Sequence, residues 1–185
     1  PSPPAPPLSP PRNLFTDKAS LQIAVDEWVA DGDAALAKYG AIDSWLVGDV
    51  QDMSLLFAGK TTFNDDIGGW DVSRVTSMSS IFYNAGNFSQ DVNGWNVSAV
   101  TTLHAAFHQA SKFNQALNSW NVSAVKSMGY TFSSFNQKMS FNQDISGWDV
   151  SEVTTLEYAF SHAVAFDQPL NSWNTSSVTN LQNVF

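Results

Sequence analysis

Few residues of this chain have both the type and the spacing that a reactive site needs. His104 and His108 stand four residues apart, a spacing that can chelate a metal ion, but the stretch HAAFH lacks the glutamate of the metalloprotease motif HExxH. Other repeats carry Ser79, Glu157 or Tyr83 at these positions, so we expect both histidines to face solvent. The chain has no cysteine, glycine-rich phosphate loop or nucleophile elbow. The sequence therefore predicts a protein that is not an enzyme and uses no metal or cofactor.

The acidic side chains suggest calcium as a second possibility. Asp65, Asp66 and Asp71 lie close together in the sequence, as do Asp144 and Asp149. Neither an EF-hand loop nor a GGxGxD repeat accompanies them, so we interpret them as a solvated acidic surface. The net charge is −9, from 17 acidic and 8 basic residues. Such a surface repels phosphate backbones, which argues against nucleic acid as a partner.

Four asparagines begin N-glycosylation sequons: Asn87, Asn96, Asn121 and Asn174. They favour a secreted or cell-surface glycoprotein. The alternative is that the repeated motif W-[DN]-V-S creates sequons by chance wherever asparagine replaces aspartate. Asn87 lies in an expected turn and is the acceptor that we expect to be most accessible.

These residues sit in a segment that the chain repeats six times. Its tryptophans follow each other at intervals of 25, 25, 25, 28 and 25 residues: Trp45, Trp70, Trp95, Trp120, Trp148 and Trp173. A fixed period of this length indicates a solenoid, in which each repeat is one coil that stacks on its neighbours. The longer interval places a three-residue insertion between Phe132 and Phe141, which is either a specific contact or a tolerated surface loop.

Each coil carries the apolar pattern I-x-x-W-x-V-x-x-V-x-x-M-x-x-x-F. The W-x-V part alternates as a strand does, and the V-x-x-M-x-x-x-F part has helical spacing. The pattern predicts an α/β solenoid, parallel and right-handed, whose strands form one sheet. It also predicts an aromatic core with three columns, of which the tryptophans are one. We favour core packing for the tryptophans over a platform for stacking sugars. The two phenylalanine columns are Phe57, Phe82, Phe107, Phe132, Phe160 and Phe185, and Phe63, Phe88, Phe113, Phe141 and Phe166.

The composition divides the chain into three parts. Residues 1–12, PSPPAPPLSPPR, are a proline-rich linker. Residues 13–40 are expected to form a helical N-terminal cap, with one helix over 16–31 that starts at Thr16 and a second that starts at Asp33 and stops at Gly40. The face of the first helix is expected to hold Leu21, Val25, Trp28 and Val29. Residues 41–185 are the repeat solenoid, and because the chain stops inside a repeat we expect it to continue.

The run W-[DN]-V-S-x-V-T-x-[ML], present at 70–78, 95–103 and 148–156, resembles the repeat of BspA-like surface proteins, the bacterial surface protein 26-residue repeat. The resemblance covers roughly residues 41–185, and the helical segment 16–40 and the proline tract before it look like algal or protist members more than bacterial ones. It implies a leucine-rich-repeat-like fold of about six 25-residue coils, surface placement, and a role in adhesion or recognition. It supplies no catalytic motif.

One residue between the inward Trp and Val of each repeat is expected to face solvent. We call five of these residues the polar strip: Asp71, Asn96, Asn121, Asp149 and Asn174. Small residues accompany them: Gly69, Gly94, Ser119, Gly147 and Ser172. The strip is our candidate binding surface for a protein or a polysaccharide, because repeat proteins bind along continuous faces. The alternative is that Asn, Asp and Gly merely suit tight coils.

The resulting hypothesis is a non-enzymatic, secreted or cell-surface repeat protein that mediates adhesion or recognition. The alternative is a structural spacer or an assembly subunit, joined to other chains through the ends of the solenoid. No apolar run approaches the roughly 20 residues that a membrane span requires, so a membrane-spanning role is not expected.

Overall fold

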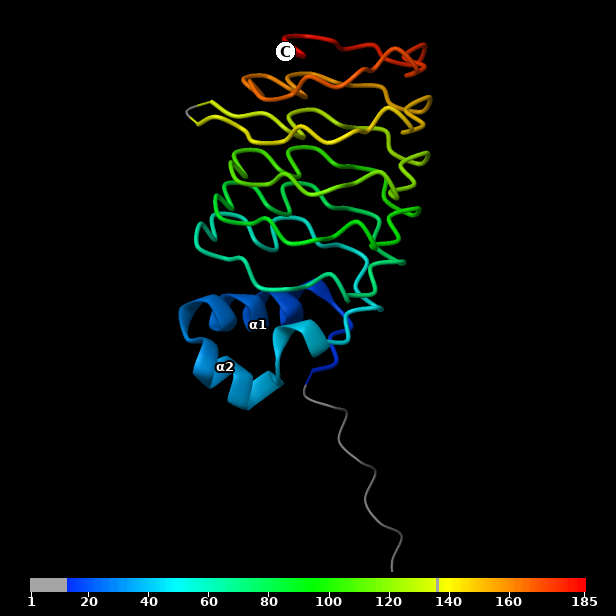
Figure 1. The fold of residues 1–185 in the computed structure, drawn as a ribbon. Helices are drawn as coiled ribbons and strands as arrows, with labels where there is room; N and C mark the ends of the chain where they lie inside the picture. The colour runs from blue at the N-terminus through cyan, green and yellow to red at the C-terminus, as the bar shows by residue number, and fades with distance from the viewer. Residues whose placement is uncertain (1–12, 136) are drawn as a thin grey trace, which may run out of the picture.

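The computed structural model describes residues 13–135 and 137–185, and shows a short helical region followed by a stack of coils (Figure 1). Helix α1 (Lys18–Ala30), helix α2 (Gly32–Tyr39) and the 3₁₀ turn η1 (Ile42–Ser44) lie at one end. The chain then winds coil upon coil toward the C-terminus at the other end. The predicted linker 1–12 and Asn136 of the insertion lie outside the described residues.

An aspartate caps the N-terminus of each helix. The cap of α1 lies one residue after the predicted start, and the cap of α2 lies two residues before the predicted start. Asp17, rather than Thr16, caps α1 and accepts a hydrogen bond from the Ser20 amide at 2.9 Å. Asp31, rather than Asp33, ends α1 and caps α2, so the two predicted start residues were wrong. Helix α2 stops as expected at Gly40, whose φ of 77° suits glycine.

The buried face of α1 is narrower than predicted. Leu21 and Val25 are buried together with Ala24, whereas Trp28 is half-buried and Val29 is exposed. The Trp28 ring packs edge-on against Trp45 of the first coil at 5.8 Å between centroids. Helix α1 therefore contacts the coil stack through its first turns and through one aromatic ring.

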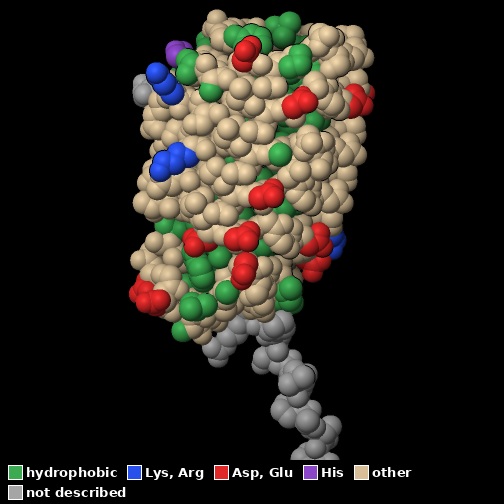
Figure 2. Space-filling model, in the orientation of Figure 1, with side chains coloured by type: hydrophobic (Ala, Val, Ile, Leu, Met, Phe, Trp, Pro, Cys, Tyr) green, Lys and Arg blue, Asp and Glu red, His purple; other side chains and the backbone are tan. Residues whose placement is uncertain are grey.

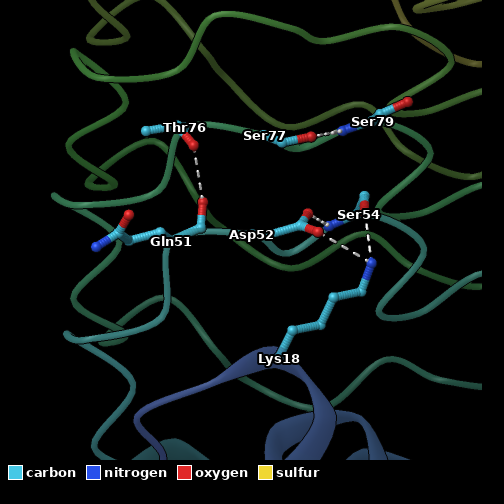
Figure 3. A network of polar contacts seen from close by, with 7 residues as sticks. All are labelled: Lys18, Gln51, Asp52, Ser54, Thr76, Ser77 and Ser79. Atoms are coloured by element: carbon cyan, nitrogen blue, oxygen red, sulfur yellow. Dashed lines mark hydrogen bonds and ion pairs between the residues drawn. The ribbon is translucent and has the colours of Figure 1, made fainter.

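Aromatic and polar contacts join the helical region to the first coil. The rings of Phe15 and Tyr39 also pack on Trp45, at 5.0 and 5.7 Å. Figure 3 shows that the Lys18 side chain extends from α1 to the first coil, where its ammonium lies 3.3 Å from the Asp52 carboxylate. Burial disfavours the charged form of Asp52, but hydrogen bonds from Ser54 and the Lys18 charge outweigh it and lower the pKa of this carboxyl.

The predicted α/β solenoid was wrong. The described part of the chain has no β-strand and no sheet, and its only α-helices are α1 and α2. Neighbouring coils are joined by isolated parallel bridges, each between one residue per coil: Asp52, Ser77, Thr102, Ser127, Thr155 and Asn180. The leucine-rich-repeat-like architecture fails for the same reason, since its coils would contribute strands to a parallel sheet.

Tight turns replace the expected strand around each tryptophan. In the second coil, the Trp70 amide donates to the Ile67 carbonyl and the Val75 amide to the Val72 carbonyl, at 3.1 and 2.9 Å. Two turns therefore enclose the W-x-V segment. Their internal hydrogen bonds use amides that a sheet would direct to the neighbouring coil, so no continuous ladder forms.

Left-handed backbone replaces the expected helical segment. One residue per coil, two after the Met or Leu of the pattern, has φ between 48° and 63°: Leu55, Ser80, Ala105, Tyr130, Tyr158 and Asn183. A helix cannot pass through such a residue. In this segment every second backbone amide donates to a carbonyl of the next coil, as the Leu55 amide does to the Ser79 carbonyl at 3.0 Å. Amides between these positions, such as that of Leu56, donate within their own coil and close turns. These inter-coil bonds offset the backbone strain.

The apolar columns lie in the core as predicted except in the last coil, where Phe185 is exposed and Phe166 is half-buried. In the tryptophan column, the five residues from Trp45 to Trp148 are at most 4% exposed and Trp173 is half-buried. This confirms that the column packs in the core and is not a platform for stacking sugars. Five of the six indoles also bond the coil before them, as the Trp120 Nε1–H does to the Val92 carbonyl at 2.9 Å, while the Trp45 indole bonds the Gly40 carbonyl. The same contact recurs at Trp70, Trp95, Trp148 and Trp173. The indole N–H explains why the column holds tryptophan and not phenylalanine.

Candidate functional site

The polar strip lies on the surface of the coil stack. All five of its residues are exposed, as are the small residues beside them, Gly69, Gly94, Ser119, Gly147 and Ser172. Figure 2 shows that the visible face of the molecule is mostly uncharged, with acidic side chains that lie close together toward the helical end and further apart toward the C-terminal end. The strip thus combines one exposed carboxylate or amide per coil with a neighbour that has little or no side chain.

Each residue of the strip also holds a turn of its own coil. Asp71 accepts a hydrogen bond from the Ser73 amide at 3.0 Å, and Asn96 accepts from the Ser98 amide at 3.2 Å. The same contact is made by Asn121, Asp149 and Asn174. The contacts from Ser73, together with the Arg74 charge, lower the pKa of Asp71. The local backbone therefore explains Asn or Asp at this position, and the second carboxylate or amide atom remains available to a partner.

The strip begins in a hollow beside the first coil. This hollow has a volume of about 430 Å³, and its lining includes Leu46, Gly48 and Asp71. A side chain at Gly48 would place its Cβ 2.9 Å from the Asp71 carboxylate, so glycine is required here unless Asp71 moves. This contact accounts for Gly48 in the first repeat, where the other repeats carry serine.

The structure divides the four sequons into two groups. Asn96, Asn121 and Asn174 are exposed, whereas Asn87, which we expected to be most accessible, is half-buried next to the buried Phe88. In two exposed sequons the serine hydroxyl donates to the asparagine Oδ1, at 2.7 Å for Ser98 and 2.8 Å for Ser123. The side chains of each of these sequons are thus in direct contact before any modification.

The two histidines do not form the solvated pair that the sequence predicts. His104 is exposed, but His108 is only 2% exposed and hydrogen-bonds Ser133 of the next coil. Burial, with a smaller effect of nearby His104, lowers the pKa of His108 to about 4. Within residues 13–135 and 137–185, no three His, Cys, Asp or Glu side chains are grouped as metal ligands. The aspartates considered for calcium are among the exposed residues.

The repeated Phe-Asn-Gln motif has a structural role that sequence reasoning missed. The Asn64 Oδ1 accepts from the Ser89 amide of the next coil at 2.8 Å, and the Gln90 side chain returns a bond to the Asn64 carbonyl. Equivalent bonds join Asn114 to Asn142, and Asn142 to Asp167. The frequent recurrence of Asn and Gln after the phenylalanine of each coil was the available signal, because amides can bond along the stacking direction.

These features define a protein of stacked repeats, held together by aromatic columns and amide ladders, that presents a recurring polar face. The model of a family described as "Mycoplasma protein of unknown function, DUF285" matches residues 32–137 and 133–185. The chain therefore belongs to this family. No curated protein and no solved structure matches it. In the part of the chain that the structure describes, no helix has the length and apolar character to span a bilayer.

Proposed function

We propose that this protein is a non-enzymatic repeat protein that binds a protein or polysaccharide surface through the polar strip. The observation that carries the proposal is the recurrence of one exposed Asp or Asn on five coils, each beside a small residue. A partner with an extended, regular surface can contact all five coils at once. Many weak contacts then add, because each later one forms within an existing complex.

The proposed location is the cell surface or the extracellular space. The resemblance of the repeat to bacterial surface repeats supports it, as does the sequon at Asn87, which lies outside the strip, so that a glycan there leaves the strip open. Mass spectrometry of the protein from its native source tests this part. Unmodified asparagine at all four sequons, in protein recovered from the cell interior, contradicts the proposed location.

Arginine on the small residues beside the strip tests the binding surface. A Cβ added at Gly94 or Gly147 meets no atom within 4 Å, and one at Gly69 meets only the Asp43 carbonyl at 3.9 Å. The triple variant Gly69→Arg, Gly94→Arg, Gly147→Arg thus blocks the strip and leaves its turn hydrogen bonds intact. The control places arginine on three exposed residues outside the strip, by Ala37→Arg, Thr62→Arg and Ala165→Arg.

Binding is measured against immobilised polysaccharides, glycoproteins and fixed cells. We expect each single strip variant to weaken binding severalfold, the triple variant to lose it, and the control to retain it. A folded triple variant that binds as well as the wild type would place the binding surface elsewhere. The same conclusion follows if the control loses binding to the same extent.

A further inference from the structure

A pocket of about 340 Å³ lies on the coil stack across the second, third and fourth repeats, away from the polar strip residues. Five of its lining residues carry rings: Tyr83, His104, His108, Tyr130 and Phe135. These rings contact one another across coils. Tyr83 stacks on His108 at 5.1 Å, and Phe135 meets the His108 ring edge-on at 4.8 Å. The rings therefore form continuous walls and not separate exposed side chains.

Two local departures from the repeat create this pocket. Ser80 and Ala105 are small residues of the left-handed column, where the following coils carry Tyr130 and Tyr158, and both border the pocket. The longer fourth repeat supplies Phe135, which is 52% exposed and has no equivalent in the other coils. Because both departures border the same space, the pocket is particular to this point of the stack.

The polar groups that line the pocket are imidazoles and hydroxyls. The Ser133 hydroxyl donates to the Tyr130 carbonyl at 3.0 Å, so the His108 Nδ1, 2.6 Å from that hydroxyl, must donate to it. The other nitrogen of a neutral His108, Nε2, is then a hydrogen-bond acceptor. Ser80 and the hydroxyls of Tyr83 and Tyr130 add groups that both donate and accept. Among the described residues that line the pocket there is no Asp, Glu, Lys or Arg.

We infer that this pocket binds a single uncharged sugar ring. The electron-rich ring faces of Tyr83, Tyr130 and Phe135 suit the electropositive C–H groups of a pyranose. The hydroxyls of the same sugar can hydrogen-bond the imidazole and phenol groups. A ligand without such hydroxyls would cover these groups and leave them without a hydrogen-bond partner, which is costly. The volume is at the lower end of the range of about 300–1,000 Å³ for ligand pockets, which fits one ring and not an extended chain.

The choice of a neutral ligand follows from the lining. Aromatic walls also attract quaternary ammonium groups, but a site for a cation gains from a carboxylate, and none lines this pocket among the described residues. Sugar binding here does not depend on the function proposed for the polar strip, because the two surfaces share no residue.

Saturation-transfer NMR with methyl pyranosides of glucose, galactose, mannose and N-acetylglucosamine tests the inference, with choline as a cationic comparison. Ala105→Tyr fills the pocket with the residue that the next two coils carry at the same backbone position, and Phe135→Ala removes the exposed wall. Leu55→Ala is the matched control, since Leu55 is exposed in the same left-handed column but lies outside the pocket.

We expect saturable binding of at least one pyranoside, with a dissociation constant near the millimolar range that one small ligand allows. Ala105→Tyr and Phe135→Ala should each weaken it about tenfold or more, and Leu55→Ala and the Arg variants of the strip should not. Binding of no pyranoside, binding of choline alone, or binding that survives in either folded pocket variant overturns the inference. Loss of pyranoside binding in the strip variants would instead assign the sugar to the strip.

Discussion

Trp120 is the residue at which the cohesion of the stack is tested most directly. It is 4% exposed, its ring stacks on Trp148 at 6.4 Å and leans on Phe107 at 6.0 Å, and its indole bonds the Val92 carbonyl. Replacing a buried aromatic residue with alanine costs about 3–5 kcal/mol of folding free energy. The Val92 carbonyl keeps the hydrogen bond that the Trp95 amide donates to it at 3.1 Å, so loss of the indole bond adds about 0.5–1.5 kcal/mol. We therefore expect Trp120→Ala to cost about 4–6 kcal/mol in total.

Trp120→Phe separates the two contributions. Phenylalanine keeps most of the aromatic contact but cannot donate to the Val92 carbonyl, which still accepts from the Trp95 amide, so the expected cost is about 0.5–1.5 kcal/mol. Urea unfolding, followed by the fluorescence of the six tryptophans that remain of seven, measures both variants. A loss below about 1 kcal/mol for Trp120→Ala would refute the assignment of the column to the core. If Trp120→Phe is as stable as the wild type, the indole bond does not account for the choice of tryptophan.

Three further predictions concern acidity, the helical end and the amide ladder. The pKa of His108 falls from 6.5 to about 4 on folding, so the stability that neutral His108 contributes is complete above pH 6.5 and is lost as the pH falls toward 4. Thermal melts should therefore show that the free energy of unfolding falls by about 2 kcal/mol between pH 7.5 and 5. The fall should disappear in His108→Gln and persist in His104→Gln. Deletion of residues 13–40 uncovers Trp45 and should cause aggregation in light scattering, whereas deletion of 1–12 should not; equal behaviour contradicts the capping role. Asn114→Ala, which removes the acceptor for the Asn142 amide and the Gln143 side chain, should lower stability by about 1–2 kcal/mol, and an unchanged urea midpoint would show that these bonds are replaced by water.

Sequence periodicity identified which side chains face the core. The 25-residue interval placed Trp70, Val72, Met78 and Phe82 at equivalent inward positions, and all four are buried. It could do so because hydrophobic spacing reports the direction of side chains. Gly40 and the aspartates near both helix starts likewise indicated, from the local sequence, where the helices begin and end. The choice of Asp17 over Thr16 as the cap depended on which side chain meets the first free amides of the helix.

The course of the backbone between those side chains was decided only in three dimensions. The spacing of Met53 and Phe57 suits a helix, yet Leu55 between them is left-handed because amides on either side bond the next coil. Whether an amide bonds within its own coil or across to a neighbour depends on residues about 25 positions away, which a local pattern does not contain. His108 is the clearest case at the level of a site: its own surroundings in the sequence suggest exposure, but Ser133 from the following coil and Phe135 from the longer repeat enclose it. The repeat thus determined the inward columns by itself, while the sign of φ, the hydrogen-bond partners and the burial of His108 followed from how one coil lies on the next.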